Sequence, residues 1–449
     1  MELTFASFSE IADAVKSKKV SAKEVASHFQ KRIQTLDSKL NSFTNHNANA
    51  LADAEAIDAR IAKGEDVGLL AGVPFGIKEI LCTKGIKTTA GSKMLSNFVP
   101  PYDSTVVARL KKAGVVVMGK LNQDEFAMGS SNETSFHGNV RNPWDLDRVP
   151  GGSSGGSAAA QAARLVAGTI GTDTGGSIRQ PASFCGIVGV KPTYGRVSRY
   201  GIVAFASSLD QAGPMVSSVQ DAALSMEVIC GHDEMDSTTS QKAVPKWSKE
   251  LSTNVKGMKI GLIKEYMKGG LDADTQKTVD ASLETLKKMG AEIVEVSVSM
   301  TEFAVPIYYL VATSEASSNL ARYDGVRYGY RAEFPNLSAV ELEDFYGKTR
   351  GEGFGKEVKR RIMLGTYCLS SGYYDAYYNK AGQVRRMLTT QYLEAFKKCD
   401  VILSPVTTSP AFKIGELIND PLTMYLNDIF TTSTNLAGLP GMKIGRAHV

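Results

Sequence analysis

Two glycine-rich stretches lie close together in the middle of the chain: Pro150-Gly-Gly-Ser153-Ser154-Gly-Gly-Ser157 and Gly171-Thr-Asp173-Thr174-Gly175-Gly176-Ser177-Ile-Arg179-Gln-Pro181. A helix is predicted to follow the first stretch, over 158–167, and a strand to precede the second, over 166–170. Glycine allows positive φ and a close approach of the backbone to a ligand, and the first stretch ends where a helix begins. We therefore expect both stretches to be functional loops held by buried elements.

Outward from these loops, helical and strand patterns alternate along the chain. Helices are predicted over 8–36, 52–63, 104–113, 272–289, 303–323 and 371–398, with a capping box at Ser21 and Glu24. Strands are predicted over 72–78, 115–118, 258–263, 291–298 and 400–404. The alternation favours an α/β fold, a mixed twisted sheet covered by helices on both faces, and 258–298 forms a βαβ-like unit. The best candidate for a boundary between structural units is the polar segment 233–254.

The composition excludes several classes of protein. With 449 residues, of which 43% are hydrophobic, the chain has a sizeable core, and disorder of its bulk is excluded. The net charge of +4 is too small to indicate binding to nucleic acid or a membrane surface. We expect no membrane span and no secretory signal. Five scattered cysteines without a CxxC pair indicate reduced thiols and no metal site, which favours a cytoplasmic protein, bacterial by default.

The glycine-rich stretches allow four interpretations. A flexible linker is disfavoured because the flanking segments are apolar, and a phosphate cradle lacks the Lys-Ser/Thr of a Walker loop. Gly151-Gly-Ser153-Ser-Gly155 fits the G-x-S-x-G nucleophile elbow, but that mechanism needs a downstream histidine. Only His232 and His448 follow, and neither has a motif around it.

The fourth interpretation makes Ser177 a nucleophile without histidine. Backbone N–H groups of Thr174, Gly175, Gly176 and Ser177 could converge on one point as an oxyanion hole. A serine hydroxyl needs a base, and a lysine made neutral by burial can serve. Lys78 ends an apolar strand and fits that requirement, but a strand-end lysine that reaches solvent is an equally good interpretation of the sequence.

These blocks, together with Gly76-Ile-Lys78, resemble the amidase signature family, serine hydrolases with a Ser–Ser–Lys triad. The resemblance implies a single large amidase domain over 1–443 in which Ser177 is the acyl-enzyme nucleophile. It also implies that Ser153, held by a cis peptide, relays the proton and that Lys78 is the terminal base. Asp173 and Arg179 are expected to brace the nucleophile loop as an ion pair.

Within that family, the chain most resembles the A subunits of tRNA-dependent amidotransferases. The diagnostic stretches include Phe126-Ala-Met-Gly-Ser-Ser131, Gly138-Asn-Val-Arg-Asn-Pro-Trp144 and Ser370-Ser-Gly-Tyr-Tyr-Asp-Ala-Tyr377. The resemblance implies hydrolysis of glutamine through an ester on Ser177, with ammonia passing to a B subunit that amidates Glu-tRNA(Gln) or Asp-tRNA(Asn). It also implies a bridging C subunit, no cofactor in this chain, and ATP and Mg used by the complex. The alternative is a stand-alone amidase of the same family.

Free glutamine carries an α-carboxylate and an α-ammonium, so its pocket needs a cation and an anion. Arg361 can bind the carboxylate through two hydrogen bonds and Asp428 can bind the ammonium, and both match substrate contacts of the family. The alternative for Arg361 is a solvated arginine in the run 359–361. One of Tyr308 and Tyr309, with Tyr308 favoured, is expected to contact glutamine. Ser130, Ser131 and Thr174 are expected to line the scissile end of the pocket.

The C-terminal end departs from the resemblance. Family members continue past Gly441, whereas this chain ends in Ile444-Gly-Arg-Ala-His-Val449. That segment resembles translated adapter DNA, so we expect 444–449 to be a foreign tail on a truncated amidase domain.

Overall fold

A seven-stranded mixed sheet forms the centre of the protein, with the strand order β1-β3-β2-β4-β6-β5-β10. The computed structural model describes residues 2–337 and 340–444. The strands are β1 (Phe43–His46), β2 (Pro74–Lys78), β3 (Val116–Leu121), β4 (Gly168–Asp173), β5 (Val188–Lys191), β6 (Gln211–Val216) and β10 (Gly441–Lys443). β2 runs parallel to both β3 and β4, and the other pairs are antiparallel. The predicted mixed sheet is confirmed.

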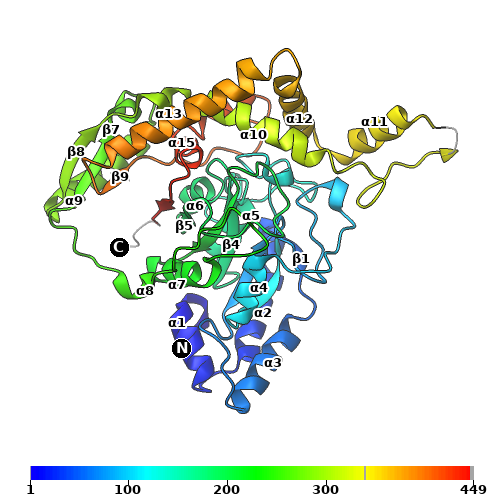
Figure 1. Ribbon diagram of the computed structural model, residues 1–449. Helices are drawn as coiled ribbons and strands as arrows, with labels where there is room; N and C mark the ends of the chain where they lie inside the picture. Colours follow the sequence, from blue (N-terminus) through cyan, green and yellow to red (C-terminus); the bar gives the residue numbers. More distant parts are fainter. Residues whose placement is uncertain (1, 338–339, 445–449) are drawn as a thin grey trace.

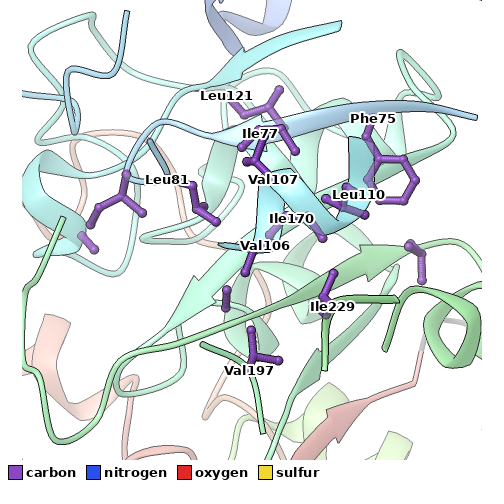
Figure 2. Packing of buried hydrophobic residues seen from close by; sticks show 14 of the residues in the cluster. Phe75, Ile77, Leu81, Val106, Val107, Leu110, Leu121, Ile170, Val197 and Ile229 are labelled. Carbon is purple, nitrogen blue, oxygen red and sulfur yellow. The ribbon is translucent and has the colours of Figure 1, made fainter. Parts of the chain in front are cut away.

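One face of the sheet packs on an apolar core. The side chains of β2 alternate, so Phe75 and Ile77 point to this face together with Ile170 of β4, against α4 (Thr105–Lys112) and α7 (Val219–Ile229). Figure 2 shows these side chains beside Val106, Val107, Leu110 and Ile229. The helix predicted over 104–113 is thereby confirmed, and its apolar side chains pack on this face.

The opposite face carries the two glycine-rich stretches. There α5 (Gly155–Ala162) and α6 (Arg179–Cys185) pack with Met215 of β6 in a smaller core. Gly171 of β4 is needed for this approach, because a Cβ would lie 2.9 Å from the Ser154 hydroxyl. Helices therefore cover both faces, as predicted, and both functional loops meet at the carboxyl ends of β2 and β4.

A second, three-stranded sheet was not predicted as a separate unit. It has the order β8-β7-β9 and is parallel throughout, with β7 (Lys259–Ile263), β8 (Glu292–Val296) and β9 (Val401–Leu403). Helix α9 (Ala273–Lys288) links β7 and β8, so the predicted βαβ unit is confirmed. The polar segment 233–254 leads from the large sheet to the three-stranded one, which lies beside α13 (Lys380–Ala395) at one end of the molecule (Figure 1).

The helical predictions hold with local changes. The stretch 8–36 is two helices, α1 (Phe8–Lys16) and α2 (Ala22–Leu40), because Lys18 takes a positive φ of 59° and the capping box of Ser21 and Glu24 starts a new helix. The stretch 371–398 contains a π-helical turn at Asp375–Asn379 before α13 (Lys380–Ala395). The other α-helices among residues 2–337 and 340–444 are α3 (Ala50–Ala62), α8 (Trp247–Glu250), α10 (Ala304–Leu320), α11 (Leu342–Gly353), α12 (Lys356–Leu369), α14 (Pro421–Leu426) and α15 (Thr432–Leu436). Figure 1 shows α10, α12 and α13 as a layer on one side of the large sheet and α1 to α3 on the other.

Within the described ranges, no helix is both long enough and apolar enough to cross a lipid bilayer. The end of the described chain forms the edge strand β10 beside β5. The predicted foreign tail covers 444–449. All of it except Ile444 lies outside the described residues, and so does His448, which is part of it.

Candidate active site

Lys78 lies at the carboxyl end of β2 and has no solvent-exposed surface. Its Nζ donates hydrogen bonds to the hydroxyls of Ser153, at 2.7 Å, and Ser154, at 2.8 Å. A third bond of 2.9 Å goes to Thr172 Oγ1 at the end of β4. Because the ammonium is enclosed by three hydroxyls, the alternative of a solvent-reaching lysine is excluded.

The charge state of Lys78 is set by this burial. Burial lowers the pKa of Lys78 to about 7, although the carboxylates of Asp124, Asp173 and Asp210 act in the opposite direction. A substantial fraction of Lys78 is therefore neutral near pH 7. A neutral amine offers a lone pair, so one of its three hydrogen bonds can reverse and a serine can donate to it.

The two serines beside Lys78 are not equivalent. Ser154 Oγ donates to the carbonyl of Thr172 at 3.1 Å and accepts from the Thr172 N–H at 3.2 Å, which ties it to β4. Within the described part of the chain, Ser153 Oγ contacts Lys78 without such a backbone tie. The Gly152–Ser153 peptide is cis, as the resemblance implied. The difference in backbone ties leaves Ser153 as the hydroxyl free to donate its proton to Lys78.

Ser177 lies on the loop between β4 and α6. Its carbonyl accepts a hydrogen bond of 3.2 Å from the Ser154 N–H, which places the nucleophile loop directly beside the serines that contact Lys78. Ser177 keeps 8% of its surface exposed, whereas Lys78 and Ser153 keep none. The nucleophile candidate therefore lies at the accessible end of the cluster and the base at its buried end.

A buried ion pair braces this loop, as predicted. The Arg179 guanidinium donates to the Asp173 carboxylate from Nε at 2.9 Å and from Nη2 at 3.1 Å. Burial alone would raise the pKa of Asp173, but the Arg179 charge and hydrogen bonds outweigh it and lower the pKa to about 2. Asn435 of α15 bonds to both partners, so the loop is also anchored to a helix far along the chain.

The predicted oxyanion hole needs one correction. The N–H of Gly176 donates to Asp173 Oδ1 at 2.8 Å, so it is already committed to the brace and is not a free donor here. For the N–H groups of Thr174, Gly175 and Ser177, no acceptor occurs among residues 2–337 and 340–444. These three remain the candidate donors to an oxyanion.

The glycines at 175 and 176 are also required for a reason the sequence does not reveal. A Cβ on Gly175 would overlap the Tyr308 ring, and one on Gly176 would overlap Thr431 Oγ1. Helix α10 and the loop before α15 therefore press directly on the nucleophile loop.

Arg361 is buried on α12, with 3% of its surface exposed, so the alternative of a solvated arginine is excluded. Its guanidinium lies 5.2 Å from the Tyr309 ring centroid and 5.5 Å from that of Tyr425. Its Nε donates to Glu357 Oε1 at 2.9 Å. The cation is thus held in an aromatic enclosure by one carboxylate.

Asp428 is the buried anion of the same region. Ser130 Oγ donates to its carboxylate at 2.9 Å. Burial raises the pKa of Asp428 to about 7, against the opposing effects of Ser130 and Arg361. A cation and an anion that suit an amino acid therefore lie on segments that pack around the nucleophile loop.

Comparison with known proteins identifies the family of this chain. The family model "Amidase" matches residues 24–447. The chain belongs to the amidase family. It is 79% identical over 444 residues to the A subunit of the glutamyl-tRNA(Gln) amidotransferase of Bdellovibrio bacteriovorus, covering 99% of this chain and 91% of that protein. The Coxiella burnetii protein of the same name is 56% identical, with 96% and 89% covered. The crystal structure of the corresponding Thermotoga maritima protein superposes with a TM-score of 0.80 at 41% identity, over 98% of this chain and 88% of that one.

The other residues predicted for the glutamine pocket of this amidase lie near the Lys78 and Ser177 segments, but their contacts differ from those expected. Ser130 was expected at the scissile end of the glutamine pocket, but its hydroxyl bonds to Asp428, the residue expected to bind the glutamine ammonium. The Thr174 hydroxyl donates to Asp210 at 2.7 Å, so it supports the loop. Ser131 is buried, and its N–H would lie 2.8 Å from a Cβ on Gly152. Tyr308 packs on the nucleophile loop and Tyr309 on Arg361, so the structure leaves both as candidate glutamine contacts.

Several supporting residues were missed by sequence reasoning. Gln180 accepts from the Gly152 N–H and donates to the Ser130 carbonyl, which joins the serine loop to the 130–131 segment. Asp124 is fully buried and accepts from Asn132 and Thr134. Asp210 supports Thr174, as described. Gln180 lies inside a quoted motif. Asp124 and Asp210 lie outside the quoted motifs, so no sequence signal identified these two acids.

Proposed function

We propose that this amidase is the glutamine-hydrolysing A subunit of a tRNA-dependent amidotransferase. The observation that carries the proposal is a single buried arrangement that combines a Lys–Ser–Ser cluster with Arg361 and Asp428, charges that match the two ends of free glutamine. Relatives at 56–79% identity bear the name of that subunit, which supports the same role.

The proposed chemistry begins at the Lys78–Ser153 contact and extends it to Ser177, whose loop lies beside Ser154. Neutral Lys78 accepts the proton of Ser153, Ser153 accepts that of Ser177, and Ser177 Oγ attacks the side-chain amide carbon of glutamine. The N–H groups of Thr174, Gly175 and Ser177 stabilise the oxyanion that forms. The relayed proton passes to the amide nitrogen, and ammonia leaves. Water then gives a proton to the same relay and attacks the Ser177 ester, and the relay returns the proton to Ser177 Oγ as glutamate leaves.

The partners of this chain follow from the same role. Ammonia passes to a B subunit, which uses ATP and Mg to activate the misacylated tRNA, and a small C subunit bridges the two in a heterotrimer. This chain itself supplies no cofactor to the hydrolysis. Because the complex serves charged tRNA, its proposed compartment is the bacterial cytoplasm.

Release of ammonia from glutamine tests the proposal. We expect the chain assembled with B and C subunits to hydrolyse glutamine, and the rate to rise when ATP and Glu-tRNA(Gln) or Asp-tRNA(Asn) are added. Full activity of the isolated chain, on simple amides as readily as on glutamine, would instead identify a stand-alone amidase.

The pH profile provides a separate prediction. As the pH falls through about 7, Lys78 gains a proton and loses its lone pair, while Asp428 gains a proton and loses the charge that binds the ammonium. We therefore expect kcat/KM for glutamine to fall below pH 7 by about tenfold per unit for one group and more steeply for two. An Asp428→Asn variant should reduce the steeper profile to the single-group slope. A flat profile from pH 6 to 8 would contradict the assignment of Lys78 as base.

A further inference from the structure

Glu357 lies one turn before Arg361 on α12, at a point where three helices meet. Its Oε1 accepts two hydrogen bonds, one of 2.9 Å from Arg361 Nε and one of 2.8 Å from the Tyr425 hydroxyl of α14. Its Oε2 accepts from Arg360. One carboxylate oxygen thus links the buried arginine to a different helix.

Tyr425 extends this link to α10. Its ring stacks on Tyr309, with centroids 4.0 Å apart and planes at 26°. Both rings lie beside the Arg361 guanidinium. The hydrogen bond from Tyr425 to Glu357 therefore fixes the aromatic enclosure and the arginine together.

The nitrogens of the Arg361 guanidinium can serve two different acceptors. Glu357 accepts a hydrogen bond from Nε. Within residues 2–337 and 340–444 the two terminal nitrogens, Nη1 and Nη2, have no acceptor, so they remain for another one. Those nitrogens are the pair that can bind a carboxylate through two parallel hydrogen bonds. A guanidinium that could rotate about its last side-chain bond would present that pair in many directions.

We propose that Glu357, assisted by Tyr425, is a positioning residue that aims Arg361 at the α-carboxylate of glutamine and so selects free amino-acid amides. The inference rests on the proposed function, because it assumes that Arg361 binds the substrate carboxylate. Glu357 acts through Arg361 and does not itself touch the substrate.

The test compares glutamine with glutaminamide, in which a neutral amide replaces the α-carboxylate. The complex with its B and C subunits is assayed, and side-chain hydrolysis is followed by chromatography of the acid product. We expect Glu357→Gln to raise KM for glutamine by about tenfold or more with little change in kcat, as for loss of a hydrogen bond between charged groups. Its kinetics on glutaminamide should be unchanged, so the preference for glutamine collapses.

A second, more conservative variant keeps the test decisive if Glu357→Gln fails to fold. Tyr425→Phe keeps the carboxylate and the ring stack and removes only the hydroxyl, and should raise KM for glutamine in the same direction by a smaller factor. The matched control is Glu352→Gln, the same change at a half-exposed glutamate of α11 that bonds to Tyr330, and it should leave both substrates unaffected.

The failures of the two proposals can be told apart. If wild-type complex and Arg361→Lys do not differ in their preference for glutamine over glutaminamide, the proposed substrate pocket is wrong. If Arg361→Lys loses the preference but Glu357→Gln and Tyr425→Phe retain it, the pocket stands and the positioning role of Glu357 is overturned.

Discussion

Ser177→Ala is expected to lower kcat for glutamine hydrolysis by about 10⁴–10⁶-fold, as removal of the nucleophile does in other serine hydrolases. Alanine has no oxygen to form the glutamyl ester, so the remaining rate reflects only binding and the oxyanion donors. KM should change little, because Arg361 and Asp428 are untouched. The measurement is ammonia release by the assembled complex, with mass spectrometry of the wild type to detect an adduct on Ser177.

The matched control is Ser157→Ala, a buried serine of α5 in the same glycine-rich segment. Its hydroxyl donates to the Ile170 carbonyl at 3.2 Å and, within the part of the chain that the structure describes, bonds to neither Lys78 nor Ser153. We expect this variant to keep its kcat. Glutaminase activity that survives in Ser177→Ala at a rate near the wild type would exclude Ser177 as nucleophile.

Lys78→Met should lower kcat by about 10²–10⁴-fold, the usual contribution of a positioned base. Methionine fills much of the space of the lysine but cannot accept a proton from Ser153. The pH dependence near 7 should shrink as well, because one titrating group is removed, leaving Asp428. Steady-state rates from pH 6 to 9 measure both effects.

Lys120 supplies a control of unusual similarity. It lies on the adjacent strand β3, is as fully buried as Lys78, and its Nζ donates to Thr83 and Thr88 hydroxyls and to the Leu81 carbonyl. Burial lowers its pKa to about 8. Lys120→Met should reduce thermal stability while the folded enzyme keeps its kcat and pH profile. Equal loss of activity in both variants would mean that Lys78 acts through stability alone.

The two catalytic changes should not be additive. In the proposed relay Ser177 and Lys78 act together, so the double variant should be scarcely slower than Ser177→Ala. A further loss of the full Lys78 factor would show that the lysine contributes by a route independent of Ser177.

Much of the site could be predicted because its motifs are local. Ser153 and Ser177 are surrounded by glycines within a few residues, and those glycines are required wherever backbone and side chains approach as closely as at Gly171 or Gly175. Because neither downstream histidine has a motif around it, a buried lysine is the remaining base, and Lys78 ends an apolar strand. The oxyanion donors were less predictable, since the use of the Gly176 N–H depends on where the Asp173 carboxylate turns.

The helices and strands could be predicted where the hydrophobic periodicity of the sequence is strong. The assignment of strands to sheets could not be predicted where the paired strands are far apart in the sequence. The βαβ unit at 258–298 has clear alternation, but its separation into a second sheet depends on β9 pairing with β7 across about 140 residues. No local pattern encodes which strand a distant segment joins.

The sequence by itself determined the family, because the motifs around Lys78, Ser153 and Ser177 are each local runs of residues. The assignment of Arg361 and Asp428 to glutamine rested on the resemblance, since these residues lie far apart in the chain. Only the tertiary structure decided that Lys78 is enclosed and its pKa lowered, that the Ser154 hydroxyl is tied to β4, and that Glu357 bonds to both Arg361 and Tyr425. Burial and hydrogen-bond direction decide such roles, and both arise when segments hundreds of residues apart pack together.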